Sequence, residues 1–258
     1  MIACPTGRFA PSPTGPLHFG SVVTAVGSFL DARSQGGRWL VRIDDIDPPR
    51  EARGASATIL NTLEALGLKW DDKVLFQSTR ISAYRAAIER LSRAGHTYSC
   101  ACSRRNIKDG PYPGTCRGAN VKSDTKYSVR VRVGDRTLTI RDAVQGDFTG
   151  SLGETSGDFI IRRKNGLYAY HLAAVIDDAW QQVNSVIRGV DLLDSTPQQL
   201  YLQMLLGFEH PHYAHLPVAL GDNGTKLSKQ TGAAPVLPID ASSALFHALR
   251  FLGLKIPD

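Results

Sequence analysis

The sequence has 258 residues, 42% of them hydrophobic and 21% charged, so the chain can bury a substantial core without crosslinks. This composition excludes a disordered or fibrous protein, and the 4 cysteines are too few for a disulfide scaffold. The 30 lysines and arginines exceed the 24 acidic residues and give a formal net charge of +6, which permits a polyanion such as nucleic acid as a partner.

The first residues and the apolar stretches indicate the cellular compartment of the protein. The opening letters, MIACPTGRFAPSPTG, lack the basic and apolar regions of a secretion signal. Charged residues interrupt apolar stretches such as 172–176 far short of the roughly 20 residues that span a bilayer. We therefore expect a cytoplasmic protein with no membrane partner.

Extended and helical segments alternate along the first hundred residues. Extended segments are predicted over 6–10 and 38–44, and amphipathic helices over 17–34, 51–66 and 80–93. Glycines follow these helices as C-cap residues, at Gly36, Gly37, Gly67 and Gly95. Because helix follows strand, the pattern predicts an α/β fold with a parallel, doubly wound sheet.

The pattern changes between about 98 and 157, a segment rich in cysteines and glycines that we interpret as an insertion. A hairpin is predicted over 129–141 around a turn at 134–135, with valines on one face and Arg130 and Arg132 on the other. We give equal weight to two roles for these arginines, a solvated surface and a face toward RNA.

The alternating pattern resumes at Phe159 and completes the sheet. A helix is predicted near 171–180 and an extended segment over 183–188. A capping-box start at Ser195 opens a helix that stops at Gly207, and a last helix is predicted near 242–251.

A proline-rich loop after the first extended segment carries the first candidate site. Its sequence, RFAPSPTGPLHFGS over 8–21, delivers His18 to the first turn of a helix. The helix N-terminus has free N–H groups and a positive dipole end, Gly20 permits close approach of a ligand, and His18 adds a donor. These features favour phosphate binding, although H-x-G alone is typical of an ordinary helix start.

A glycine-flanked loop over 221–232, GDNGTKLSKQTG, is the second candidate site. Lys226 and Lys229 are three residues apart, so a closing loop can bring both ammonium groups over one anion. Where negative charge builds on a leaving pyrophosphate, each well-placed donor contributes roughly 3 kcal/mol. The alternative is a solvated lysine-rich turn, and this segment taken by itself favours that alternative.

Together the two segments resemble the HIGH and KMSKS signatures of class I aminoacyl-tRNA synthetases, here HFGS over 18–21 and KLSKQ over 226–230. The string RFAPSPTG resembles the glutamyl branch of that family. Further matches are RIDDIDPPR over 42–50, YAYHL over 168–172 and IRGVD over 187–191. The resemblance extends from residue 7 to about 232.

The resemblance implies an α/β, Rossmann-like class I synthetase catalytic domain over 1–98 and 158–232. It implies a zinc-bearing insertion over 99–157 that binds the RNA arm, and a short helical C-terminal segment over 233–258. Only 28 residues follow Gln230, so we expect no anticodon-binding body.

The truncation and the cysteine-bearing insertion resemble a shortened glutamyl branch whose members are ligases. They activate L-glutamate with ATP and transfer it to queuosine in the anticodon arm of tRNA(Asp). The implied partners are ATP with Mg²⁺, L-glutamate and that queuosine-bearing anticodon arm. Two alternatives are a shortened glutamyl-tRNA synthetase that charges the 3′ end of tRNA, and a non-catalytic, synthetase-like RNA-binding module.

The resemblance also implies a glutamate pocket, made of Arg8, Phe9, Ala10, Pro11, Ser12, Asp44, Tyr170 and Arg188. The chemistry agrees, because an acidic side chain requires cations such as Arg8 and Arg188, and the substrate ammonium requires a carboxylate such as Asp44. The family commonly has Glu at the position of Asp44, one methylene longer, so we expect a bridging water or a slight approach of the strand.

For ATP, the resemblance implies binding by His18, Gly20, Ser228 and Lys229. The catalytic residues it implies are His18, Lys226 and Lys229. Gln230 replaces the usual final Ser of the KMSKS motif, and we expect little loss because the charge lies on the lysines.

Three cysteines in the insertion, Cys100, Cys102 and Cys116, form a candidate structural zinc site that needs a fourth ligand. His96, Asp109 and Tyr112 are within reach, and composition alone favours His96, because phenolate is a rare zinc ligand. The family's C-x-C and Y-x-x-x-C arrangement implies Tyr112 instead. The alternative is three reduced cysteines that pack as small hydrophobic residues.

Two further groups of polar residues receive no catalytic role. His210, His212 and His215 are interpreted as residues at the entrance of a strand rather than as metal ligands. Asp177 and Asp178 lie on the helix after the Tyr170 segment and are expected to be helix-face residues or supports of the site.

Overall fold

The computed structural model describes residues 4–103, 110–119, 121, 126–218 and 235–255. Its helices are α1 (Phe19–Ser34), α2 (Ala55–Ala65), α3 (Ile81–Arg93), α4 (Leu152–Thr155), α5 (Tyr170–Trp180), α6 (Thr196–Leu206) and α7 (Ala241–Phe251). Its strands are β1 (Thr6–Phe9), β2 (Arg38–Ile43), β3 (Leu75–Phe76), β4 (Thr97–Cys100), β5 (Ser128–Val131), β6 (Thr137–Asp142), β7 (Gly146–Ser151), β8 (Ile160–Arg162), β9 (Ser185–Gly189) and β10 (His212–Leu216). Within the described ranges, none of the helices has the length and apolar character needed to traverse a bilayer.

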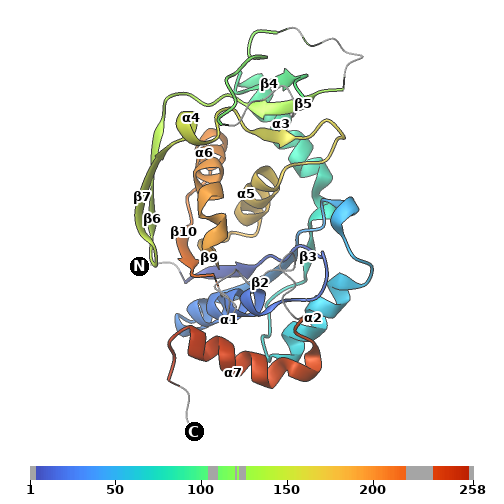
Figure 1. Cartoon of the computed structure of the whole chain (residues 1–258), viewed down its shortest axis with the longest axis vertical. Coiled ribbons are helices and arrows are strands. Elements are labelled where there is room, and N and C mark those ends of the chain that lie inside the picture. Colours follow the sequence, from blue (N-terminus) through green and yellow to red (C-terminus); the bar gives the residue numbers. More distant parts are fainter. Residues whose placement is uncertain (1–3, 104–109, 120, 122–125, 219–234, 256–258) are drawn as a thin grey trace.

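A seven-stranded sheet in the order β3-β2-β1-β9-β10-β6-β7 forms the centre of the fold (Figure 1). All neighbouring strands from β3 to β6 pair in parallel, and β7 pairs with β6 antiparallel. Helices α1, α2 and α6 connect parallel neighbours, as in a doubly wound sheet. The predicted α/β fold with a mostly parallel sheet is confirmed.

Helices cover both faces of this sheet and enclose two apolar cores. On one face, α1, α2 and α7 pack over a core that includes Trp39 (Figure 1). On the other face, α3, α5 and α6 bury a core that includes Tyr84. Side chains of a strand alternate between the two faces. Phe9 of β1 therefore enters the first core, whereas its neighbour Arg8 contacts Asp178 of α5.

The hairpin predicted over 129–141 is wrong. β5 pairs with β4 and β8 in a separate three-stranded antiparallel sheet, while β6 pairs with β7 at the edge of the main sheet. A period of two identifies a strand with one buried face but does not select its partner. Arg130 is also buried and donates to the backbone carbonyl of Asp158 at 2.5 Å, so its side chain is not on the surface.

The segment interpreted as an insertion contributes to both sheets. β5 joins the small sheet near the top of Figure 1, whereas β6 and β7 extend the main sheet beyond β10. The domain boundaries at 98 and 158 therefore stay a prediction. The last helix, predicted near 242–251, corresponds to α7, and its Ala244 and Ala248 pack in the core of α1 and α2.

Candidate functional site

The carboxyl ends of β1, β2 and β9 meet at one edge of the main sheet. From β1 the chain proceeds toward β3 in one direction, and from β9 it proceeds toward β10 in the other. In doubly wound sheets this reversal opens a crevice that binds ligands. A cavity of about 240 Å³ lies at these strand ends, and four of the predicted glutamate-binding residues line it, namely Ala10, Ser12, Asp44 and Tyr170.

Beneath this cavity, two arginines from neighbouring strands share one carboxylate of α5. Arg42 Nη1 lies 2.5 Å and Arg8 Nε 3.3 Å from Asp178 Oδ1. Arg42 Nε also pairs with Asp44 Oδ1 at 2.7 Å. All four side chains are buried, so two guanidinium groups and two carboxylates balance one another away from water.

The two carboxylates of this cluster differ in proton affinity. Burial raises the pKa of Asp44 to about 6, against the lowering effect of Arg42. Burial also disfavours the charged form of Asp178, but Arg8 and Arg42 outweigh it and hold the pKa of Asp178 below its ordinary value. Asp44 is therefore the carboxylate that both faces the cavity and changes its proton occupancy more readily.

The loop after β1 is tied to the end of β2 by backbone. The N–H of Asp44 donates to the carbonyl of Pro11 at 3.0 Å, which holds Ala10 and Ser12 beside the cavity. Phe9 is placed differently, because its side chain is in the core on the other face of the sheet.

Arg188 lies at the end of β9 and is surrounded by neutral groups. It donates to His215 Nε2 at 3.0 Å, Gln199 Oε1 at 2.7 Å, Thr196 Oγ1 at 2.7 Å and the Tyr170 hydroxyl at 3.3 Å. Within the described residues it forms no ion pair with a carboxylate. Tyr170, which lines the cavity, connects Arg188 to it. The arrangement leaves a buried cation available to an anionic ligand.

His18 is the N-cap residue of α1, one position before the helix, whereas the sequence predicted it in the first helical turn. Its Nδ1 accepts the backbone N–H of Ser21 at 3.3 Å, so the imidazole satisfies one of the free donors of the first turn. Gly20 lies in the same turn. His18 also forms an isolated bridge with Pro235, and the N–H of Val236 donates to the Leu17 carbonyl at 2.7 Å. The predicted residues Lys226, Ser228 and Lys229 lie outside the described residues.

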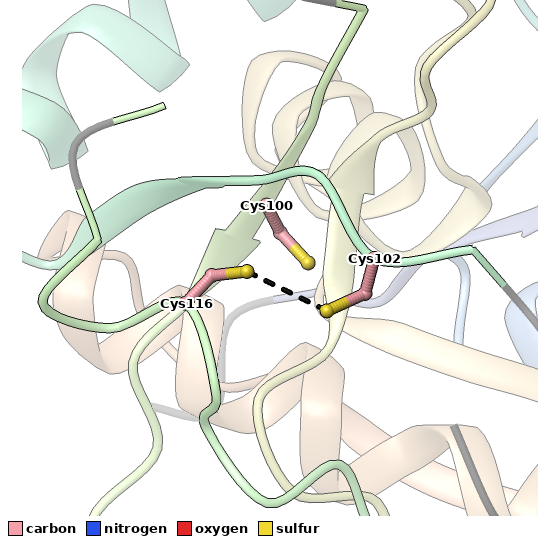
Figure 2. Close-up of side chains that lie close together, drawn as sticks. All are labelled: Cys100, Cys102 and Cys116. Carbon is pink, nitrogen blue, oxygen red and sulfur yellow. Dashed lines mark hydrogen bonds between the residues drawn. The ribbon is translucent and has the colours of Figure 1, made fainter. Parts of the chain in front are cut away.

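Three cysteines form the other candidate site. Cys100 ends β4, Cys102 follows it, and Cys116 lies in the chain before β5. Figure 2 shows their sulfur atoms turned toward one another; all three lie within 4.8 Å, and Cys102 Sγ is 3.5 Å from Cys116 Sγ. Four sulfur ligands about 2.3 Å from a tetrahedral ion lie about 3.8 Å apart, so this spacing fits a metal.

The Tyr112 hydroxyl lies 3.3 Å from Cys100 Sγ and 3.5 Å from Cys102 Sγ. His96, favoured by composition alone, is not part of the group of possible metal ligands that the described residues form. Gly157 lets the chain at Tyr112 approach closely, because a Cβ at position 157 would lie 2.5 Å from the Tyr112 carbonyl oxygen. The backbone thus brings the Tyr112 hydroxyl oxygen close to the sulfur atoms of Cys100 and Cys102.

Arg130 adds positive charge beside this cluster. Its Cζ lies 3.8 Å from the centroid of the Tyr112 ring. Burial raises the pKa of the Cys100 thiol, but hydrogen bonds from Tyr112 and Arg130 outweigh it and lower the pKa to about 7. Cys100 can therefore lose its thiol proton near neutral pH, and a deprotonated sulfur is the form that binds metals.

Comparison with known proteins identifies the family. The chain matches the model of class I tRNA synthetases (E and Q), catalytic domain, over residues 6–111 and 117–245. It is 52% identical over 262 residues to the glutamyl-Q tRNA(Asp) synthetase of Dechloromonas aromatica, covering 98% of this chain and 87% of the relative. The chain belongs to the glutamyl-Q tRNA(Asp) synthetase family. A Pseudomonas aeruginosa member is 50% identical over 260 residues, covering 100% of this chain and 88% of the relative.

Members of the glutamyl-Q tRNA(Asp) synthetase family are ligases, and the chain is an enzyme of that class. A crystal structure of a glutamate tRNA ligase from Elizabethkingia meningosepticum in complex with its amino acid superimposes with a TM-score of 0.80 at 28% identity. The match covers 91% of this chain and 54% of that ligase. A Mycobacterium tuberculosis methionyl-tRNA synthetase shares the fold alone, with a TM-score of 0.65 at 14% identity. These comparisons support glutamate-tRNA ligase-type activity.

The sequence did not predict the contacts of several residues that shape the site, although Asp178 was one of two aspartates expected on a helix face or as supports of the site. Asp178 neutralises Arg8 and Arg42, while Thr196, Gln199 and His215 hold Arg188. Sequence signals existed for two of these groups, since Asp178 is a charged residue inside an apolar helix and Thr196 follows a helix-start signal. Neither signal predicts which arginine the residue contacts.

Proposed function

We propose that the chain activates L-glutamate with ATP and transfers the glutamyl group to queuosine in the anticodon arm of tRNA(Asp). The observation that carries the proposal is a pair of opposite charges: the buried carboxylate of Asp44 lines the cavity, and Arg188, whose partners are neutral, donates to Tyr170, which also lines it. Glutamate has carboxylates for an arginine and an ammonium for an aspartate. The acceptor follows from the names of the relatives.

Gln199 adds to the case for an acidic ligand. Its Oε1 accepts from Arg188, while its buried Nε2 has no hydrogen-bond partner within the described residues. A buried donor of this kind is costly unless a ligand or water satisfies it. In the proposal, a substrate carboxylate accepts from both Arg188 and Gln199.

The proposed reaction has two steps. An oxygen of the glutamate α-carboxylate attacks the α-phosphorus of ATP, and the bond to the bridging oxygen breaks to release pyrophosphate. A hydroxyl of the queuosine cyclopentenediol then attacks the acyl carbon and releases AMP. Mg²⁺ accompanies ATP, and catalysis depends on positioning and charge stabilisation, because no protein nucleophile is required.

The nucleotide is assigned to the N-terminus of α1 and to the lysine loop. His18 and Gly20 would contact the phosphate and ribose side, and Lys226, Ser228 and Lys229 the phosphates. In support, the chain pairs with His18 at Pro235, six residues after Lys229 in the sequence. Two segments about two hundred residues apart thereby meet at the start of one helix.

The cysteine cluster is assigned to one structural zinc ion with Tyr112 as fourth ligand. Sulfur-rich tetrahedral sites are typical of zinc, and the Tyr112 hydroxyl already contacts two of the sulfur atoms. When bound, the ion would crosslink β4 to the chain before β5. We propose that this part of the chain contacts the RNA arm, in keeping with the insertion predicted over 99–157.

Replacing Tyr112 with phenylalanine is expected to weaken zinc binding at least tenfold, because the site loses its oxygen ligand while the ring remains. Chelator competition measures the affinity, and the visible spectrum of the cobalt-substituted protein reports the ligand set. Tyr127→Phe is the matched control, since Tyr127 packs against the apolar core. Equal zinc affinity in the two variants would remove Tyr112 from the ligand set.

The decisive test of activation is exchange of labelled pyrophosphate into ATP, with glutamate present and tRNA absent. Glutamate-dependent exchange, with aspartate and glutamine inactive, is expected. A lack of exchange would favour a non-catalytic RNA-binding module.

A second experiment locates the acceptor. Queuosine-containing tRNA(Asp) is charged with labelled glutamate and cut with nuclease. Label on an anticodon-arm fragment is expected from the proposal. Label on the terminal adenosine would identify a shortened glutamyl-tRNA synthetase.

A further inference from the structure

A chain of hydrogen bonds connects Arg188 to Asp142 at the end of β6, two strands away in the main sheet. Arg188 Nε donates to His215 Nε2 at 3.0 Å, and His215 Nδ1 lies 2.5 Å from Asp142 Oδ2. The three residues come from the neighbouring strands β9, β10 and β6. Arg188 and His215 are 27 positions apart, and His215 and Asp142 are 73. The chain of contacts thus exists only in the folded sheet.

The partners of His215 define its tautomer. Arg188 Nε carries only a donor, so His215 Nε2 must accept, and the Asp142 carboxylate requires a proton on Nδ1. The Thr196 hydroxyl, 3.1 Å from Nε2, can act as donor or acceptor and is compatible with this tautomer. Burial lowers the pKa of His215, although Asp142 raises it. A second proton on the ring would place an N–H group against Arg188. His215 is therefore neutral, with its lone pair turned to the arginine.

Asp142 is itself held by the backbone around it. Its Oδ1 accepts from the N–H groups of Val144 at 3.0 Å, Gln145 at 2.8 Å and His215 at 3.1 Å. Both Asp142 and His215 have fully buried side chains. These backbone hydrogen bonds hold the Asp142 carboxylate in place, so it can fix the orientation of the His215 imidazole.

We propose that Asp142 and His215 are positioning residues that orient Arg188 for the carboxylate of an acidic substrate. The proposal rests on the proposed function, in which Arg188 binds glutamate. A carboxylate in direct contact would orient Arg188 but neutralise it. A neutral imidazole holds Nε by a hydrogen bond and leaves the positive charge of the guanidinium available to the ligand, while Asp142 keeps the imidazole in the accepting tautomer.

The test compares two amides that each replace one imidazole nitrogen. In His215→Gln the terminal amide takes the place of Nε2 and can still accept from Arg188, whereas in His215→Asn it takes the place of Nδ1 and cannot reach it. His215→Asn is expected to raise the KM for glutamate about tenfold, the loss typical of one hydrogen bond to a charged group. The kcat and the KM for ATP should stay within about twofold, and His215→Gln should restore most of the glutamate affinity.

Asp142→Asn provides an independent measurement. Its amide can donate to His215 Nδ1, which forces the proton of the ring onto Nε2 and turns a donor toward Arg188. We expect a rise in the KM for glutamate in the wild-type background and little further rise in the His215→Gln background, where no Nδ1 exists. Additive effects of the two substitutions, or equal defects in His215→Gln and His215→Asn, would overturn the proposal.

Arg188→Gln, measured alongside, separates this proposal from the proposed function. If Arg188→Gln raises the KM for glutamate at least tenfold while His215→Asn and Asp142→Asn do not, the positioning role alone fails. If Arg188→Gln leaves the KM for glutamate unchanged, the assignment of the glutamate pocket fails. Each variant is measured both in the exchange assay and in a thermal melt. A variant that fails to fold lacks the melting transition and is thereby distinguished from one that only binds glutamate less tightly.

Discussion

Replacing Asp178 with asparagine is expected to lower the free energy of unfolding by about 3 to 5 kcal/mol, the largest effect on stability foreseen for this chain. The variant keeps the size of the side chain but removes the carboxylate that contacts both buried arginines, Arg8 and Arg42, while Asp44 stays paired with Arg42. An uncompensated charge away from water accounts for the loss. Urea denaturation followed by far-ultraviolet circular dichroism measures it.

The matched control is Asp72→Asn, which removes the charge of an exposed ion pair with Arg38. Exposed pairs contribute about 0 to 1 kcal/mol, so this variant should unfold almost as the wild type does. Similar losses in the two variants would show that the buried cluster does not stabilise the fold.

The effect of Asp178 should also depend on pH. Arg8 and Arg42 depress the pKa of Asp178 in the folded state against the opposing effect of burial. Its stabilisation is therefore complete above the pKa of an unfolded aspartate, about 4, and is lost as the pH falls through the lower folded value. The difference between wild type and Asp178→Asn should shrink in acid, and a difference independent of pH would contradict this account.

Replacing Lys229 with alanine is expected to slow adenylate formation about 100-fold while the affinity for glutamate changes little. In the proposed reaction, negative charge accumulates on the leaving pyrophosphate, and the lysine would stabilise it there more than in the bound substrates. Pyrophosphate exchange measures the rate, and the glutamate dependence of the exchange gives the affinity.

Lys255→Ala is the control for loss of one positive charge, because Lys255 is exposed beyond the end of α7. It should behave like the wild type in both measurements. Equal losses of rate and glutamate affinity in Lys229→Ala would count against a role confined to the departing pyrophosphate.

Local pattern was sufficient to predict most helices. The segments predicted over 17–34 and 80–93 correspond to α1 and α3, because amphipathic spacing and C-cap glycines are properties of neighbouring residues. The helix predicted over 51–66 begins later, at Ala55. The three cysteines were grouped from their spacing, and the structure brings their sulfur atoms together.

Strand pairing and buried charge were not predictable in the same way. The alternation of apolar and polar residues over 129–141 correctly indicated two strands, yet β5 and β6 belong to different sheets. The sequence of a strand does not specify which strand it pairs with. Arg130 was expected in solvent or against RNA and instead is buried and stacks on Tyr112. The backbone carbonyl of Asp158, 28 positions along the chain, accepts a hydrogen bond from it.

The amino-acid sequence by itself determined the alternating α/β pattern, the two motifs that begin at His18 and Lys226, and the family to which they belong. All of these depend on residues close together along the chain. Only the tertiary structure decided how the charges of the site are balanced, with Asp178 shared by Arg8 and Arg42 and the neutral His215 against Arg188. Those contacts join residues 27 to 170 positions apart, and the free energy of a buried charge depends on which groups the fold brings to it.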